Sequence, residues 1–159
     1  MAATADDSPG VPIPPPLLFV FGFLAGLITD GVVPLALLGS ERRSLAVWGG
    51  WGAIGVGIAL TLWGIVTFAR HRTAVMPHLP ARRLVTGGPY RFTRNPMYVG
   101  LVLAYVGLAL LIDTAWPLLL LPAVLALLVV VVVRREERYL ARAFGDAYRD
   151  YQCRVRRWI

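Results

Sequence analysis

Two polar segments of this chain carry residue types that could do chemistry, and both lie beside long apolar runs. The first covers residues 84–100 (LVTGGPYRFTRNPMYVG), and the second is Arg134-Arg135-Glu136-Glu137. Paired glycines in the first segment allow a ligand to approach the backbone, and two prolines restrict its conformation. The glutamates of the second segment suit a cationic or amine-bearing ligand. Together, the two segments predict a binding site with backbone on one side and a carboxylate on the other.

The Asn95-Pro96 pair predicts the start of a helix. Proline is favoured at the first helical position, and the residue before it is turned away from helical geometry, so Asn95 is expected to cap this helix. The free amides of such a helix start could also bind a ligand carboxylate. Capping and ligand contact both remain open for Asn95.

Glu136 and Glu137 cannot both point the same way if they lie on a helix, because neighbouring helical side chains are about 100° apart. We expect one glutamate to face a pocket and the other an arginine. Ion pairing of both with nearby arginines at the membrane interface is the alternative.

Other common chemistries have little support in the residues. His71 and His78 are separated by a proline, and Cys153 is the single cysteine, so no metal site is expected. No serine lies in a nucleophile context, and no phosphate-binding glycine loop is present. The arginines do not accompany a nucleic-acid-binding motif, so no nucleic-acid partner is expected.

The composition indicates a membrane protein. Of 159 residues, 57% are apolar and 16% are charged, which is too hydrophobic for an ordinary soluble domain. Four apolar runs cover residues 17–38, 45–69, 97–112 and 115–133; the first two are long enough to cross a bilayer, and the third is shorter. The predicted fold is all-α: a polytopic transmembrane helical bundle of about four spans, with a cytosolic loop and an amphipathic C-terminal helix. Residues 1–16 are expected to be a flexible leader, and 17–159 a single integral-membrane domain.

The distribution of arginine predicts the orientation. Six arginines lie between Arg70 and Arg94 and eight between Arg134 and Arg157. By the positive-inside rule, the 70–96 loop and the C-terminal tail are cytoplasmic, and a polar turn at Asp113 lies outside. Arg42 and Arg43 are exceptions to the positive-inside rule, because this orientation places them outside together with Asp113.

Smaller features predict local structure. Glycines between residues 49 and 64 offer small faces for close helix packing. Asp30 lies in the first apolar run, where Gly31 and Pro34 are expected to break the helix, so that Asp30 caps the next piece of chain or faces water. Gly145 is expected to separate two helices in the tail.

The order of these motifs resembles the isoprenylcysteine carboxyl methyltransferase family and its relatives among the phospholipid methyltransferases. The resemblance rests on residues 84–90, residues 94–100, the glutamate pair, and the aromatic and Arg-Val positions after that pair. It covers residues 73–158.

This resemblance implies a membrane methyltransferase that uses S-adenosyl-L-methionine and moves its methyl group to a lipophilic or small acceptor. Carried over by position, it implies a set of cofactor-binding residues, namely Val75, Arg82, Arg83, Leu84, Val85, Tyr90, Asn95, Pro96, Tyr98, Glu136 and Glu137. No catalytic residue is assigned. The implied partners are the lipid bilayer and a lipophilic methyl acceptor.

Two departures from the prenylcysteine enzymes bear on the acceptor. Asn95 stands where those enzymes have histidine, and Val132 stands where they have a substrate-binding arginine. Asparagine keeps a hydrogen bond but cannot act as an acid or base near neutral pH. The alternatives are therefore a phospholipid or amine N-methyltransferase and a non-catalytic membrane scaffold.

Overall fold

The computed structural model describes residues 10–11, 13–38, 42–71 and 83–158, and every regular element in them is helical. The elements in chain order are α1 (Pro15–Val32), α2 (Arg43–Arg70), the short 3-10 helix η3 (Gly88–Arg91), α3 (Pro96–Ile112), α4 (Trp116–Leu128), the π turn η4 (Val129–Val133), α5 (Arg134–Phe144) and α6 (Asp146–Arg154).

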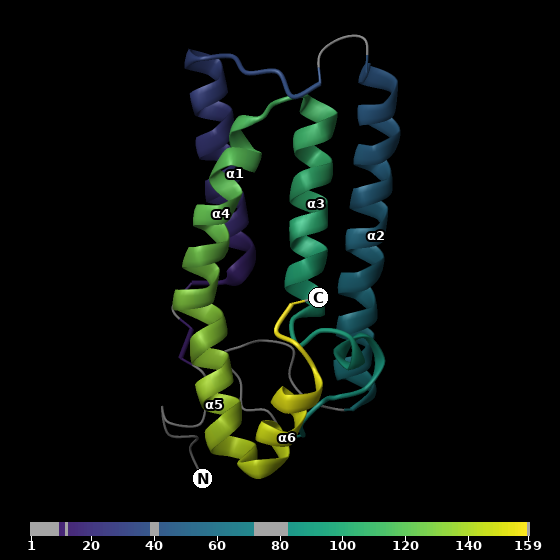
Figure 1. Cartoon of the computed structure of the whole chain (residues 1–159), viewed down its shortest axis with the longest axis vertical. Coiled ribbons are helices and arrows are strands. Elements are labelled where there is room, and N and C mark those ends of the chain that lie inside the picture. The colour runs from purple at the N-terminus through teal and green to yellow at the C-terminus, as the bar shows by residue number, and fades with distance from the viewer. Residues whose placement is uncertain (1–9, 12, 39–41, 72–82, 159) are drawn as a thin grey trace.

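Helices α1 to α4 run side by side along the long axis and alternate in direction (Figure 1). Three helical stretches are long and apolar enough to cross a membrane, namely Pro15–Val32, Arg43–Arg70 and Trp116–Phe144. The fourth bundle helix, α3, has 17 residues, or about 25 Å at the helical rise. The all-helical membrane bundle expected from the sequence is confirmed.

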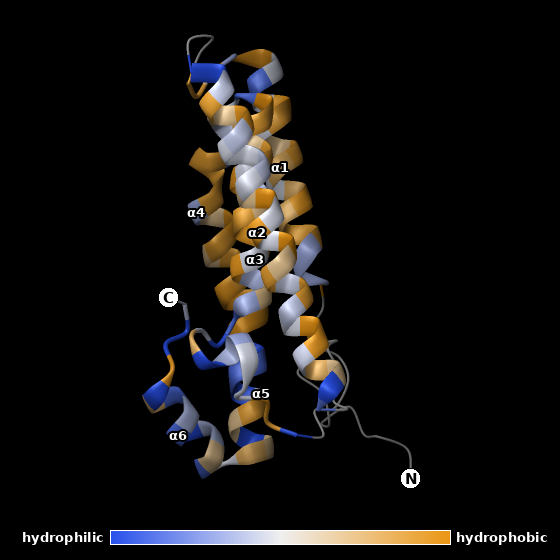
Figure 2. Ribbon diagram, turned by 90° about the vertical axis from the view of Figure 1, so that its right-hand side faces the viewer, coloured by the Kyte–Doolittle hydropathy of each residue, from blue (hydrophilic) through white to orange (hydrophobic). Residues whose placement is uncertain are grey.

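Polar residues gather at the end of the bundle where α5 and α6 lie (Figure 2). α5 continues α4 beyond the bundle, α6 turns back from it, and the chain then returns to the start of α3 (Figure 1). The start of α1, the end of α2 and the start of α3 are at this same end. The two polar segments of the sequence are therefore brought together there.

Glycine allows α2 and α3 to pack backbone to backbone. A β-carbon added at Gly57 would lie 2.5 Å from the carbonyl oxygen of Gly100, and one at Gly50 would lie 2.8 Å from that of Gly107. These two pairs are one helical heptad apart, which keeps the same face of each helix in contact. The glycine faces predicted from sequence thus form a specific interface.

We expect Gly57→Ala to destabilise the bundle by about 1–3 kcal/mol, because the new methyl group would overlap a backbone carbonyl. Gly55→Ala is the matched control on the same helix, since nothing lies within 4 Å of its position. Its effect should stay within about 1 kcal/mol. Unfolding of the two variants in detergent micelles measures the difference, and equal stability would contradict the close α2–α3 contact.

The first span is shorter than the predicted 17–38 run. α1 begins at Pro15, inside the expected leader, and ends at Val32. Asp30 accepts a hydrogen bond from the Leu35 amide (Oδ1 to N, 3.0 Å). The helix therefore stops at the Gly31–Pro34 region, and Asp30 stabilises the turn after it, as expected.

The polar turn at Asp113 is confirmed and has a second role. Asp113 has a left-handed backbone (φ 61°) at the end of α3. Its Oδ1 accepts the amides of Leu37 at 3.2 Å and Leu38 at 2.9 Å. One carboxylate thus ties the α3–α4 turn to the chain that leaves α1.

The π turn interrupts the valine run between α4 and α5. Its five residues, Val129–Val133, lie directly before the second polar segment. A π turn holds about one residue more than an α turn, so it changes the direction in which the next side chains point. The sequence analysis did not predict it, because an unbroken apolar run is also typical of a regular α-helix.

Candidate functional site

Glu136 points into the bundle end and pairs with α3. Its Oε1 accepts a hydrogen bond of 2.7 Å from the hydroxyl of Tyr98. Tyr98 lies in the first turn of α3 and is 9% exposed, while Glu136 lies in the first turn of α5. The contact joins the two polar segments identified in the sequence.

Tyr90, in η3, contributes a buried hydroxyl to the same region. Its ring packs on Phe68 of α2 (centroids 5.1 Å apart), and its carbonyl accepts the Tyr151 hydroxyl at 2.7 Å. Among the described residues, the Tyr90 hydroxyl itself has no hydrogen-bond partner. Burial, with Tyr151 and Glu136 nearby, raises the pKa of Tyr90. The group is therefore a neutral donor that is free to bind a ligand.

Glu137 faces away from Glu136 and binds two arginines. Its carboxylate accepts Arg157 through Nε (3.0 Å) and Nη2 (2.7 Å), and it lies 3.0 Å from Nη1 of Arg94. The Arg94 and Glu137 side chains are 13% and 14% exposed. The hydrogen bond to Glu137 raises the pKa of Arg157. One glutamate thus faces the interior and the other faces arginine, as the helical spacing predicted.

Asn95 stands at the N-cap position of α3, but its side chain does not cap the helix. Instead, its Nδ2 donates to the carbonyl of Arg157 at 2.9 Å, and the Thr93 hydroxyl donates to the same oxygen at 3.1 Å. The capping role expected for Asn95 is therefore wrong. Its amide is used to hold the chain after α6.

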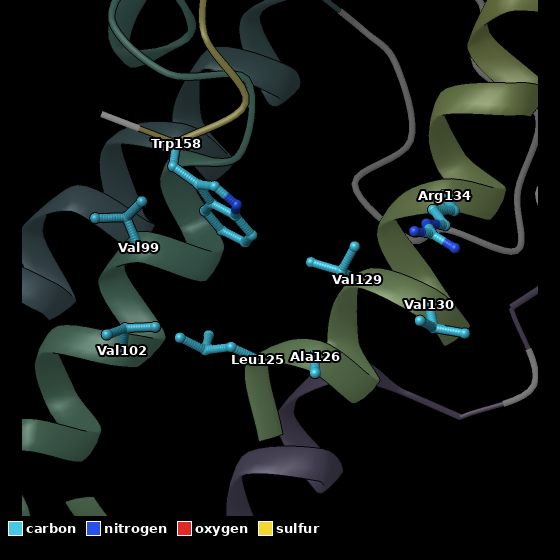
Figure 3. Close-up of a pocket in the computed structure, with 8 residues that line it drawn as sticks. All are labelled: Val99, Val102, Leu125, Ala126, Val129, Val130, Arg134 and Trp158. Atoms are coloured by element: carbon cyan, nitrogen blue, oxygen red, sulfur yellow. The ribbon is translucent and has the colours of Figure 1, made fainter. Parts of the chain in front are cut away.

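An apolar groove of about 680 Å³ lies between α3 and α4. Most of its lining is valine, leucine and alanine, with Arg134 and Trp158 as the larger groups (Figure 3). Val130 is 54% exposed, so the groove is open on the outside of the bundle. Val99 of α3 and Arg134 of α5 line the groove, and they are close in sequence to Tyr98 and Glu136. The apolar groove and the polar contact are therefore neighbours.

Comparison with known proteins identifies the family of the chain. The family model described as phospholipid methyltransferase matches residues 45–147, well over half of the chain. The chain belongs to the phospholipid methyltransferase family. Its apolar helices and this membership make it an integral membrane protein.

Two curated relatives match shorter stretches of this phospholipid methyltransferase family member. The cobalt-zinc-cadmium resistance protein CzcN of Cupriavidus metallidurans is 39% identical over 63 residues, which are 40% of this chain and 29% of CzcN. The protein-S-isoprenylcysteine O-methyltransferase of Schizosaccharomyces pombe is 36% identical over 72 residues, which are 45% of this chain and 30% of that protein. The matched segments thus span less than a third of either relative. No solved structure matches the chain significantly.

The other predicted cofactor-binding residues occupy different surroundings. Val85 is buried with Tyr90, and Leu84 packs against them. Pro96 is buried at the first position of α3, whereas Arg83 is exposed. Val75 and Arg82 lie outside the described residues, so their predicted roles stay predictions.

Several residues at the site were not singled out by the sequence analysis. Arg94 and Thr93 lay within the first polar segment, but nothing in the sequence assigned them partners. Arg157 is one of eight arginines in the tail, and no local signal distinguishes it from the others. Tyr151 is one of the aromatic positions after the glutamate pair on which the family resemblance rests, but the sequence gives it no partner.

The site offers groups that fit S-adenosyl-L-methionine. Glu136 can accept a hydrogen bond from an amino or hydroxyl group, and the free amides in the first turn of α3 can bind a carboxylate. The unpartnered Tyr90 hydroxyl supplies a buried polar contact, and Val85 and Leu84 supply apolar surface.

We expect Glu137→Ala to destabilise the protein by about 2–4 kcal/mol, because it leaves the largely buried guanidinium of Arg94 without its carboxylate. Asp146→Ala is the matched control, since the Asp146–Arg149 pair has side chains 89% and 72% exposed. Loss of that exposed pair should change stability by less than about 1 kcal/mol. Thermal unfolding in detergent micelles tests both variants, and equal effects would argue against a structural role for Glu137.

Proposed function

We propose that this chain is an S-adenosyl-L-methionine-dependent methyltransferase that works at the membrane surface on a lipophilic acceptor. The observation that carries the proposal is the Tyr98–Glu136 contact, with the unpartnered Tyr90 hydroxyl nearby and an apolar groove beside it. Family membership and the S. pombe relative support the same reaction class.

The residues take complementary parts in binding. Glu136 receives the amino group or a ribose hydroxyl of the cofactor, and the first amides of α3 receive its carboxylate. Tyr90 donates its free hydroxyl. The other residues proposed to surround the cofactor are Val75, Arg82, Arg83, Leu84, Val85, Asn95, Pro96 and Glu137. Of these, Asn95 and Glu137 act indirectly, through the contacts that hold α3, α5 and the tail together.

The cofactor supplies an activated methyl group on its sulfonium centre. The task of the chain is to hold an acceptor in line with that group and to keep water away. A carboxylate or thiolate acceptor needs no strong base, whereas an amine must be deprotonated before it reacts. The open side of the groove gives a lipophilic acceptor a route in from the bilayer.

One observation supports an amine or phospholipid acceptor as a second candidate beside a prenylcysteine carboxylate. Val132 stands where the prenylcysteine enzymes carry a substrate-binding arginine, and here it is fully buried (0% exposed) in the core shared by α1, α3 and α4. No cation reaches a substrate carboxylate from that position. Amine methylation is therefore the second candidate function.

We expect Tyr90→Phe to weaken S-adenosyl-L-methionine binding about tenfold, because the cofactor loses a hydrogen bond to a buried hydroxyl. Without cofactor, the same variant should be as stable as the wild type or more stable, since it removes a buried polar atom that has no partner. Isothermal titration calorimetry and thermal unfolding in the same micelles measure the two effects.

Glu136→Gln should weaken cofactor binding at least as much, since it removes the carboxyl group that receives the cofactor while keeping an acceptor for Tyr98. Asp146→Asn is the matched control, because it makes the same change at a side chain that is 89% exposed. Absence of cofactor binding by the wild-type protein would refute the proposed function. Unchanged binding in both site variants would refute the proposed site.

The arginine distribution supports a cytoplasmic position for the 70–96 loop and the tail. Cys153 tests this, because it is an exposed free thiol in α6 and the chain has one cysteine. In sealed vesicles with the cytoplasmic face inside, a membrane-impermeant maleimide should label Cys153 only after the membrane is opened.

A Cys153→Ser, Leu38→Cys variant is the control for this labelling. Leu38 is exposed at the opposite end of the bundle, beside Asp113. Its thiol should react in intact vesicles. The reverse labelling pattern would show that the orientation is inverted.

A further inference from the structure

We propose that Trp158 determines which acceptors this enzyme accepts, by forming the end wall of the apolar groove between α3 and α4. The inference rests on the proposed methyltransferase function and adds to it a residue that controls acceptor size. It depends on how the segment after α6, residues 155–158, is held and on where it places the indole.

Hydrogen bonds and an ion pair fix this segment to the chain before α3. The Arg94 amide donates to the Arg156 carbonyl at 3.0 Å. The next carbonyl, that of Arg157, accepts both the Thr93 hydroxyl and the Asn95 amide group, while the Arg157 side chain binds Glu137. Backbone and side chain are thus held one residue before Trp158. The position of the indole is set by the same contacts that order the cofactor side of the site.

The indole of Trp158 reaches the groove and the core at once. It packs against the core formed by α1, α3 and α4, and it lines the groove. Figure 3 shows it at one end of the groove, with Val99 of α3 on one side and Val129 of the π turn on the other. Leu125 and Val102 lie farther along the same groove (Figure 3).

Trp158 stands at the end of the groove where the methyl group would be transferred. Val99 is the next residue after Tyr98 on α3, and Arg134 comes two residues before Glu136 on α5. An acceptor whose apolar chain lies in the groove must therefore bring its reactive group past the indole. A rigid aromatic wall at this point limits the bulk of the chain beside the reactive group and fixes how far the acceptor advances.

The wall lies outside the part of the chain that the family model matches. That match ends at residue 147, so the family model does not assign Trp158 a role. Indole is well suited to the place, because it combines a large apolar surface with a polar N–H and is favoured where a membrane meets water.

The test compares Trp158→Ala with Trp51→Ala, each in the full-length chain reconstituted in phosphatidylcholine vesicles. Trp51 is 60% exposed on α2 and does not line the groove, so its removal controls for loss of a tryptophan. Methyl-labelled cofactor is offered with two series of acceptors, S-alkyl-N-acetylcysteines and N-alkyl amines, each with short, medium and branched bulky chains. Cofactor affinity is measured by calorimetry on the same samples.

For the acceptors that the wild type methylates, we expect Trp158→Ala to raise KM about five- to tenfold and to shift the preference toward bulkier chains, because the groove loses a wall. Cofactor affinity should stay within about twofold of the wild type, since the Trp158 indole makes none of the proposed cofactor contacts. Trp158→Phe, which keeps an aromatic wall, should restore most of the wild-type preference. Trp51→Ala should behave like the wild type.

The outcomes separate this inference from the function on which it rests. If the wild type binds no cofactor and labels no acceptor, the proposed function fails and the role of Trp158 falls with it. If the wild type is active and Trp158→Ala shows the same chain preference and KM as Trp51→Ala, the role of Trp158 alone is refuted. A loss of cofactor affinity in Trp158→Ala that Trp158→Phe does not restore would also refute it, because that pattern indicates general damage to the site.

Discussion

The ion pairs of Glu137 with Arg94 and Arg157 are the interactions on which the polar end of the bundle, around α5 and α6, depends. The Glu137 carboxylate holds Arg94 from the chain before α3 and Arg157 from the chain after α6, so three separate segments meet at one charged group. Since Glu136 is its neighbour on α5, holding Glu137 against the arginines turns Glu136 toward Tyr98. The orientation of the carboxylate proposed to bind the cofactor thus depends on an ion pair on the other face of the helix.

The bundle supports this arrangement by pairing its helices unequally. Gly57 and Gly100 bring α2 and α3 into backbone contact, while α1 packs along α4. α3 and α4 are held less tightly to each other, and the apolar groove lies between them. In the proposed function, the closely packed pair α2–α3 forms a rigid wall beside the polar cofactor, and the open side between α3 and α4 admits an apolar acceptor.

Much of this structure could be predicted from the sequence, because its signals are local. Apolar length predicted the spans, Pro96 marked the start of α3, and Gly145 separated α5 from α6. Adjacent positions on a helix also predicted that Glu136 and Glu137 point in different directions. The features that could not be predicted depend on contacts between distant segments. The position of Asn95 before Pro96 is typical of a helix cap, but its side chain binds the distant Arg157 carbonyl instead. No property of Arg157 alone distinguishes it from the other tail arginines.

The π turn at Val129–Val133 sets the direction in which α5 points its side chains relative to those of α4. α4 must present one face to α1, and α5 must present Glu136 to α3 and Glu137 to the arginines. A continuous α-helix would tie these two requirements to a single angular phase, whereas the wider turn offsets the phase by about one residue, or roughly 100°. The turn thus joins the apolar helix α4 to the polar helix α5, which carries Glu136 and Glu137. Without the turn, either the face that α4 packs against α1 or the side chain that Glu136 presents to Tyr98 would be rotated out of place.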